Sequence, residues 1–203
     1  MAIIALDLDG TLITCEPRQS AVLRAACIRN GICADVAAVW RLKRSGKSTL
    51  QALEILGTPT PLASKVAADW IAMIEEPQWL ALDSAFPGTH PWLTAVKESG
   101  HQLQLITARR RAEFLRPELR NLGLESFFSW IHCVSEGAVS SAKANHLQHS
   151  GARLFIGDSE SDALAAKYAG CPFAAVSTGQ LSEEFLQGAV GAGIHPSLDR
   201  IAW

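Results

Sequence analysis

The sequence predicts an α/β protein: a Rossmann-like parallel sheet with helices on both faces, and an all-helical segment inserted after the first strand. Three observations predict this class. From residue 84 onward, short β-rich runs alternate with helical stretches of about ten residues, which is typical of βαβ units. A further β-rich run opens the chain. The residues between these two regions show only helical periodicity.

The alternation can be followed in order along the second half of the chain. Helices are expected over residues 89–99, 111–122, 142–149 and 162–169, and each is followed by a glycine, a common stop signal. The β-rich runs that come next are HQLQLITA, SWIHCV, RLFIGD and PFAAVST. Together with AIIALDLD at the start, these runs predict about five strands.

Residues 16–82 break the alternation. Helices are expected there over residues 19–30, 36–43, 48–56 and 62–74. We interpret Trp40 and Trp70 as core aromatic residues of this insert rather than as a binding platform. The segments GTPTP and EEPQW are expected to be turns that join helices. We therefore expect an α/β core made of residues 1–15 and 83–203, with residues 16–82 as a helical module.

Composition excludes several classes of protein. Hydrophobic residues make up 48% of the 203 residues, which is enough for a substantial core. A net charge of −2 gives no indication of a nucleic-acid partner. Neither a signal peptide nor an apolar run long enough to cross a bilayer is expected. The five scattered cysteines form no CxxC pair and indicate reduced thiols in a cytoplasmic protein.

Two acids follow the first expected strand. In LDLDGTLI, Asp7 and Asp9 are two residues apart, so their side chains leave an extended backbone in about the same direction. Two carboxylates about 5 Å apart repel by roughly 3 kcal/mol at an effective dielectric constant near 20. A divalent cation would remove this repulsion, and oxygen ligands suit Mg²⁺. The alternative is a solvated acidic turn that closes the strand.

Other strand ends carry matching residues. FIGDSESD places Asp158, Glu160 and Asp162 after another apolar run, and LQLITAR ends a strand at Thr107. The carboxyl ends of parallel strands share one edge of the sheet, so these acids can converge on the same cation. The hydroxyl of Thr107 is suited to hold a phosphate oxygen, and Lys143 near the start of a helix supplies a fixed positive charge.

These segments carry a resemblance to a known family. DLDGTL, LITA, a lone lysine and GDSESD, in this order, resemble the four motifs of the haloacid dehalogenase superfamily of phosphohydrolases. FPGTHPWL and the tail from STGQLS onward are similar to its phosphoglycolate-phosphatase-like branch, whose members carry a helical cap of the C1 type. The resemblance implies that residues 16–82 are this cap, which closes over the site and contacts the leaving group.

The resemblance also implies the catalytic roles. Asp7 would be the nucleophile that becomes an aspartyl-phosphate. Asp9 would be the general acid and then the general base. Thr107 and Lys143 would hold the phosphoryl oxygens. An aspartate at position 9 favours phosphate-ester chemistry, because dehalogenating and phosphonate-cleaving members lack an acid there.

The ligands of Mg²⁺ are implied in the same way. Asp158 would bind the cation together with Asp7 and the backbone carbonyl of Asp9. Asp162 would bind it directly or through water. The cation would screen the charge between a carboxylate nucleophile and a phosphate dianion.

Two basic segments have open interpretations. RLKRSGKST resembles the substrate-specificity loop of the cap, and Arg44 or Lys47 is a candidate to bind an anionic part of the leaving group. A solvated basic helix end is the alternative. For Arg109, Arg110 and Arg111, just past Thr107, we favour a solvated helix start over an arginine that faces the site.

The expected function is that of a Mg²⁺-dependent phosphomonoesterase that acts on a small phosphorylated metabolite. A sugar phosphomutase of the same superfamily is an alternative, since it shares the core and the cap. A second alternative is a catalytically silent protein that binds a phosphate ligand. The substrate and the oligomeric state, monomer or homodimer, stay open at this stage.

Overall fold

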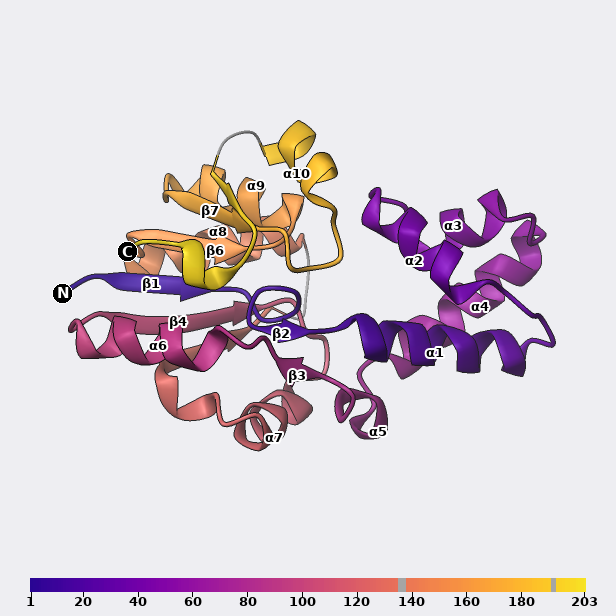
Figure 1. The fold of residues 1–203 in the computed structure, drawn as a ribbon, viewed down its shortest axis with the longest axis horizontal. Helices are drawn as coiled ribbons and strands as arrows, with labels where there is room; N and C mark the ends of the chain where they lie inside the picture. The colour runs from indigo at the N-terminus through magenta and orange to yellow at the C-terminus, as the bar shows by residue number, and fades with distance from the viewer. Residues whose placement is uncertain (135–137, 191–192) are drawn as a thin grey trace.

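A computed structural model describes residues 1–134, 138–190 and 193–203. Its main sheet has six strands in the order β5-β4-β1-β6-β7-β8, and every neighbouring pair is parallel (Figure 1). The strands are β1 (Ile3–Leu6), β4 (Gln102–Thr107), β5 (Phe128–Cys133), β6 (Leu154–Gly157), β7 (Phe173–Val176) and β8 (Ile194–His195).

Strand β1 lies in the middle of the sheet, between β4 and β6. Leu6, the last residue of β1, is opposite Leu105 of β4 and Ile156 of β6. Because the three strands are parallel and in register, their carboxyl ends meet at one edge of the sheet. The residues that follow these strands are therefore brought together, although they are far apart in the sequence.

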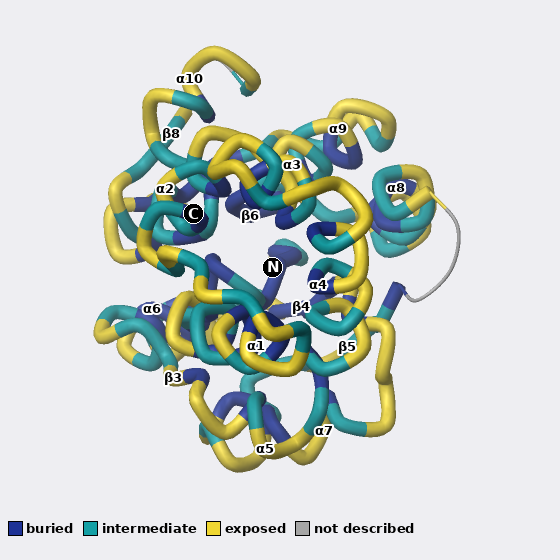
Figure 2. Tube along the Cα trace, turned by 90° about the vertical axis from the view of Figure 1, so that its right-hand side faces the viewer, coloured by how far each residue is buried: buried dark blue, intermediate teal, exposed yellow. Residues whose placement is uncertain are grey.

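Helices cover both faces of the sheet. On one face, α6 (Thr89–Glu98) and α7 (Ala112–Asn121) pack on a cluster that includes Leu6 and Leu105. On the other face, α8 (Val139–Ser150) and α9 (Glu160–Ala169) pack on a cluster that includes Ala5 and Ile106. Neighbouring strand residues belong to different clusters, as expected for a sheet buried on both sides (Figure 2). The predicted α/β fold class is confirmed.

Five helices lie between the first strand and the second half of the core. They are α1 (Glu16–Arg29), α2 (Val36–Arg44), α3 (Thr49–Ile55), α4 (Thr60–Met73) and α5 (Pro77–Leu80). Helix α3 begins with a capping box between Ser48 and Gln51. Helices α1 to α4 enclose a cluster of their own around Leu23, Val39 and Leu53. They project from one end of the core (Figure 1).

A short two-stranded sheet joins this insert to the core. Strand β2 (Ile13–Thr14) pairs antiparallel with β3 (Ser84–Ala85), with Ile13 opposite Ala85. The segment that leaves the core toward α1 and the segment that returns from α5 therefore run side by side. A hydrogen bond from the backbone N–H of Phe86 to the carbonyl of Leu12 continues this contact.

Some elements differ from the sequence-based expectation. The EEPQW segment, expected to be a turn, contains the start of the short helix α5, whose first residue is Pro77, a position that favours proline. Strand β8 and helix α10 (Glu183–Val190) were not expected, and the remaining helical turns are η1 (Glu125–Phe127) and η2 (Leu198–Arg200). Within the described ranges, no helix has the length and apolar character that crossing a membrane requires.

Candidate active site

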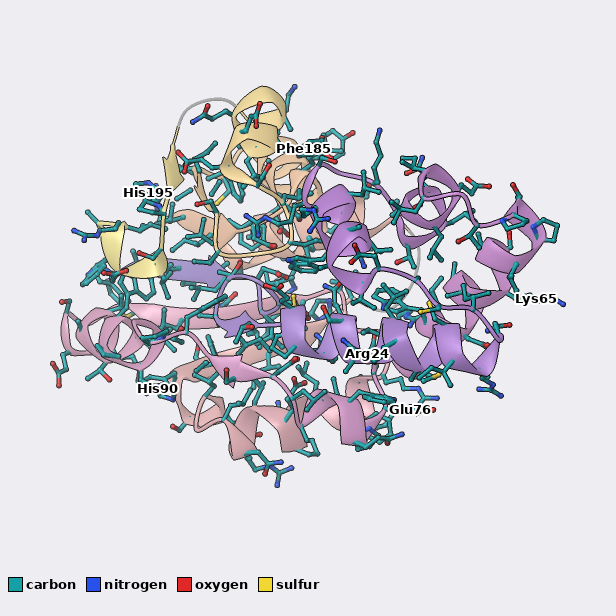
Figure 3. The ribbon with its side chains drawn as sticks, turned by 45° about the vertical axis from the view of Figure 1, so that its right-hand side comes forward. Arg24, Lys65, Glu76, His90, Phe185 and His195 are labelled. Carbon is teal, nitrogen blue, oxygen red and sulfur yellow. The ribbon has the colours of Figure 1, made fainter. Side chains whose placement is uncertain are left out.

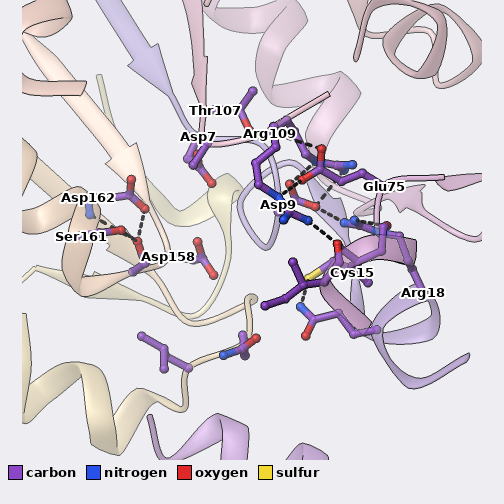
Figure 4. A pocket seen from close by; sticks show the side chains of 18 of the residues that line it. Asp7, Asp9, Cys15, Arg18, Glu75, Thr107, Arg109, Asp158, Ser161 and Asp162 are labelled. Carbon is purple, nitrogen blue, oxygen red and sulfur yellow. Dashed lines mark hydrogen bonds and ion pairs between the residues drawn. The ribbon is translucent and has the colours of Figure 1, made fainter. Parts of the chain in front are cut away.

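Three acids lie together at the carboxyl edge of the sheet. Asp7 follows β1, Asp158 follows β6, and Asp162 is in the first turn of α9. Each offers a carboxylate oxygen that lies within 4.8 Å of the other two, and all three residues are buried (Figure 4). Thr107 ends the neighbouring strand β4 and is also buried. The convergence expected from the strand ends is therefore present.

Lys143 reaches this cluster from helix α8. Its ammonium lies 2.6 Å from Oδ1 of Asp7 and 2.6 Å from Oδ1 of Asp162. Burial alone would lower the pKa of Lys143, but the two facing carboxylates outweigh burial and raise it. The ammonium therefore stays charged and links two of the three acids.

One ammonium does not compensate three buried carboxylates. Burial raises the pKa of Asp7 to about 7, against the opposite effect of Lys143. Burial also raises the pKa of Asp158 well above its ordinary value, and the negative charges of Asp7 and Asp162 act in the same direction. Such a cluster is compensated by a divalent cation, and its donors are all oxygens, the ligand type that Mg²⁺ prefers. The residues present therefore fit a Mg²⁺ site.

Asp9 lies between two arginines rather than with the other acids. The guanidinium of Arg109 donates from Nε to Oδ2 of Asp9 at 2.6 Å and from Nη2 to Oδ1 at 2.9 Å. Arg18 of helix α1 also donates to Oδ1 (Figure 4). Burial would raise the pKa of Asp9, but the two guanidinium groups outweigh burial and hold that pKa below its ordinary value.

Two further buried acids share the same arginines. Oδ2 of Asp83 lies 2.8 Å from Nε of Arg18, and Oε1 of Glu118 accepts from Nη2 of Arg109 at 3.1 Å. Burial raises the pKa of Asp83 to about 6 and that of Glu118 to about 7. The result is a buried network in which two cations are shared by three acids.

The expectation of a solvated helix start was wrong for Arg109. Its side chain is 5% exposed and is paired with Asp9 and Glu118. Arg110 is half exposed, and the backbone N–H groups of Arg110 and Arg111 donate to Glu75 at 2.9 and 2.8 Å. Sequence reasoning also missed Arg18. The sequence does indicate that a second acid beside Asp7 needs a cationic partner. It does not indicate which of the chain's arginines is that partner of Asp9.

A cavity of about 550 Å³ lies between the sheet edge and the helical insert. Its floor is formed by the acids, Thr107 and Lys143. The insert and the nearby core loops contribute the walls, which comprise Cys15, Arg18, Gln19, Trp70, Ile71, Ile74, Glu75, Ala108, Arg109, Arg110, Ser159, Ser161, Gln180 and Leu181. Trp70 thus belongs to the insert's cluster, as expected, and also faces the cavity.

Arg44 and Lys47 are not among the residues that line the cavity within the described part of the chain. Instead, Arg44 donates from Nη1 to the carbonyl of Gly179 at 3.1 Å, and its own carbonyl accepts from the N–H of Ser182 at 2.9 Å. Gly46, with φ of +82°, lies against the ring of Phe185, which Figure 3 places on the side of the core next to the insert. A substrate-binding role for Arg44 or Lys47 stays a prediction.

The loop that receives Arg44 also touches the acidic cluster. A Cβ atom at position 179 would lie 1.7 Å from Oδ2 of Asp158, so only glycine fits there. The neighbouring Thr178 donates from its hydroxyl to the carbonyl of Gly10 at 2.6 Å. One loop therefore connects the insert with both acidic strand ends.

Comparison with known proteins decides the family. A family model described as haloacid dehalogenase-like hydrolase matches residues 1–170. The chain belongs to this hydrolase family. The resemblance inferred from the four motifs and the expected class of enzyme, a phosphatase of this family, are thereby confirmed.

Relatives within the haloacid dehalogenase-like family include phosphatases. The chain is 25% identical to a phosphoglycolate phosphatase of Yersinia pestis over 181 residues, which cover 83% of this chain and 78% of the relative. The same identity and coverage relate it to a phosphoglycolate phosphatase of Yersinia pseudotuberculosis.

Solved structures of the family share the fold. A haloacid dehalogenase-like hydrolase from Streptococcus pneumoniae has a TM-score of 0.77 at 19% identity, with 96% of this chain and 93% of that chain covered. A structure described as a predicted phosphoglycolate phosphatase from Haemophilus somnus has a TM-score of 0.74 at 20% identity, with 97% and 94% covered. One described as a β-phosphoglucomutase from Thermotoga maritima has a TM-score of 0.66 at 21% identity, with 96% and 94% covered.

Proposed function

We propose that this hydrolase is a Mg²⁺-dependent phosphomonoesterase that acts on a small phosphorylated metabolite through an aspartyl-phosphate intermediate on Asp7. The observation that carries the proposal is the meeting of Asp7, Asp158, Asp162 and Lys143 at the carboxyl edge of the parallel sheet. A buried, mixed cluster of this kind suits the binding of a phosphate group and a divalent cation.

Asp7 is the proposed nucleophile. Its Oδ1 accepts from Lys143, which orients the carboxylate and leaves its second oxygen for attack on phosphorus. The attack forms an O–P bond to Asp7 and breaks the bond between phosphorus and the leaving oxygen. Water then attacks the phosphorus of the aspartyl-phosphate, which releases inorganic phosphate and restores the carboxylate.

Thr107 and Lys143 are proposed to hold the phosphoryl oxygens. Both line the cavity and are almost fully buried, so their hydrogen bonds to an anion face little competition from water. Each would stabilise the negative charge that shifts onto these oxygens during transfer.

Asp9 is the proposed general acid and base. In the observed geometry its carboxylate accepts three hydrogen bonds from two arginines, which keep it deprotonated, the form that a general base requires. Taking up the proton of the attacking water and donating a proton to the leaving oxygen both require these contacts to loosen, because they favour the charged carboxylate.

Asp7, Asp158, Asp162 and the backbone carbonyl of Asp9 are proposed to hold Mg²⁺. The cation would screen the negative charge between the nucleophile and the phosphate dianion. For Asp162 we favour a contact through water, because its Oδ1 accepts from Lys143 and its Oδ2 from the hydroxyl of Ser159 at 2.5 Å.

Residues 16–82 are proposed to act as the cap of the site, attached to a core of residues 1–15 and 83–203. Residues of the insert already form one wall of the cavity, which supports this assignment. Arg44, the last residue of α2, and Lys47, in the turn before α3, are the proposed substrate-binding residues of the insert. Arg44 also holds the insert against the loop of Gly179. A cytoplasmic location stays a prediction.

A phosphate-release screen over small phosphate esters with Mg²⁺ tests this function, with Asp7→Asn as the blank. We expect at least one ester to be hydrolysed and the variant to lose about three orders of magnitude in kcat or more. An isomeric phosphate ester as the main product, in place of inorganic phosphate, would support the mutase alternative. Tight phosphate binding without turnover would support the silent-binder alternative. Equal rates for Asp7→Asn and the unmodified protein would refute the proposed nucleophile.

A further inference from the structure

The cations of the cavity are already paired with acids of the chain. Arg18 and Arg109 contact Asp9, and Lys143 contacts Asp7 and Asp162. Arg110 lies 3.4 Å from Glu75 and also donates from Nη2 to the carbonyl of Ile71. Lys143 is needed for the phosphate itself. No other lysine or arginine lines this cavity in the described part of the chain.

Part of the wall that the insert contributes is apolar. Trp70, Ile71 and Ile74 lie at the end of α4 and line the cavity from the insert, and Leu181 lines it from the core. Ile71 is 47% exposed, so its side chain is accessible to a ligand in the cavity. This wall can contact the non-phosphate part of a bound ester.

Most of the polar side chains in the cavity walls already form hydrogen bonds within the chain. The amide of Gln19 accepts from Lys43 at 2.6 Å and donates to Sγ of Cys15. The hydroxyl of Ser159 contacts both Ser161 and Asp162. By contrast, the amide of Gln180 has no hydrogen-bond partner among the described residues, and it lines the cavity. One neutral amide is therefore available to a ligand.

We propose that the preferred substrate is a phosphate monoester whose leaving group is uncharged and presents an apolar face to Trp70, Ile71 and Ile74. This inference rests on the proposed function and adds the class of its leaving group. The proposed substrate differs from the one in the names of the two Yersinia relatives, because phosphoglycolate carries a carboxylate in addition to its phosphate.

The physical reason is the cost of burying a second anion. A carboxylate in this cavity would lose water and would meet Glu75 and Asp9, both of which are acids that line it. Each cation that it could approach already faces an acid of the chain, so the carboxylate would compete with an existing ion pair. An uncharged group avoids this cost and gains contact with the apolar wall. Gln180 can still donate to a hydroxyl or carbonyl oxygen of such a group.

Two pairs of substrates test the inference with the intact protein and Mg²⁺. The first pair is 2-phosphoglycolate and its amide, which have nearly the same size and differ in charge. The second pair is benzyl phosphate and ethyl phosphate, which are both uncharged apart from the phosphate and differ in apolar area. We expect kcat/KM to favour the amide over phosphoglycolate, and benzyl over ethyl phosphate, by about tenfold each.

Variants at Ile71 test whether the apolar wall causes these substrate preferences. Ile71→Ala should lower kcat/KM for benzyl phosphate about fivefold more than kcat/KM for ethyl phosphate. Ile71→Lys places a cation in the cavity and should reverse the preference between phosphoglycolate and its amide. Ile28→Ala is the control, because Ile28 is 71% exposed on helix α1 and is not among the lining residues.

The outcomes separate this inference from the proposed function. If no ester of either pair, and none in the phosphate-release screen, is hydrolysed, the proposed function fails. If esters are hydrolysed but phosphoglycolate is preferred to its amide, the function stands and the inference is overturned. Equal effects of Ile71→Ala and Ile28→Ala on the ratio between benzyl and ethyl phosphate would also overturn it.

Discussion

Glu118 and Asp83 contact the guanidinium group of Arg109 together with Asp9. Glu118 is buried and shares Nη2 of Arg109 with Asp9 and Asp83. Burial raises the pKa of Glu118 to about 7, against the effect of Arg109, and the charges of Asp9 and Asp83 add to the rise. A carboxyl group with a raised pKa in the folded state binds its proton more tightly there than in the unfolded chain.

The pH dependence of stability follows from this difference. Below the ordinary pKa of 4.5, Glu118 is protonated in both states, and its contribution to the free energy of unfolding is fully present. As the pH rises through about 7, this contribution is lost. Glu118→Gln stays neutral, so between pH 4.5 and 8 its free energy of unfolding should rise relative to the unmodified protein by up to about 3 kcal/mol.

Urea unfolding across this pH range measures the effect. Glu113→Gln removes an exposed carboxylate from the same helix and serves as the matched control, which should follow the unmodified protein. The comparison uses only the slope of the unfolding free energy against pH, because glutamine also changes the contact with Arg109 and so shifts the free energy at every pH. Parallel slopes for Glu118→Gln and the unmodified protein would contradict a raised pKa of Glu118.

The sequence predicted the residues of the acidic cluster better than their partners. Asp7, Thr107 and Asp158 could be placed together because each lies at or directly after the end of a strand, and parallel strand ends share one edge. The pairing of Asp9 with Arg18 and Arg109 could not be predicted in this way. It depends on how helix α1 is seated on the core, and the sequence pattern of a helix shows its apolar face without fixing its partner.

The turn between α2 and α3 is the element that seats the insert on the core. Gly46 in this turn has φ of +82°, and a Cβ atom there would lie 2.5 Å from the ring of Phe185. Gly57, after α3, has φ of +87° but no atom within 4 Å of such a Cβ. The two glycines therefore have nearly the same backbone strain with different surroundings.

Alanine substitutions of Gly46 and Gly57 separate the cost of backbone strain from the cost of a clash with Phe185. Gly57→Ala should cost about 1–2 kcal/mol of unfolding free energy from the left-handed backbone alone. Gly46→Ala should cost about 1 kcal/mol more and should raise KM, because Phe185 or the insert must move. Urea unfolding and steady-state kinetics measure both effects. Phe185→Ala should restore KM in the Gly46→Ala background, whereas equal behaviour of the two glycine variants would exclude the contact with Phe185.

At the level of elements, the long helices and buried strands were predicted within a few residues. Helix α2 was expected over residues 36–43 and extends over Val36–Arg44. The two-residue strands β2, β3 and β8 were not predicted, because two residues carry no alternation pattern. Their pairing comes from the packing of distant segments and is not encoded locally.

The stability of the whole molecule depends on the cluster of Asp7, Asp158 and Asp162, where three buried carboxylates face the one ammonium of Lys143. A ligand that binds the folded chain and not the unfolded chain raises the free energy of unfolding by mass action. Mg²⁺ at 100 times its dissociation constant should therefore stabilise the protein by about 2.7 kcal/mol. The melting temperature, measured with Mg²⁺ and with a chelator, reports this change.

Asp158→Asn should remove most of the stabilisation by Mg²⁺, because it deletes one of the buried oxygen charges of the cluster. Glu98→Gln, which changes an exposed acid at the end of α6, should keep it. If Mg²⁺ shifts the melting temperatures of the two variants equally, the cation is bound elsewhere, and the cluster is not its site.

The antiparallel pairing of Ile13–Thr14 with Ser84–Ala85 has a consequence for how such a chain can diversify. Because the outgoing and returning segments are hydrogen-bonded neighbours, the chain leaves the core and returns to it at one place. Deletions, duplications or wholesale replacement of the intervening helices need not disturb the path of the remaining polypeptide. New substrate selectivity can thus evolve by replacing the helices of the insert, provided that the contact of Arg18 with Asp9 is kept.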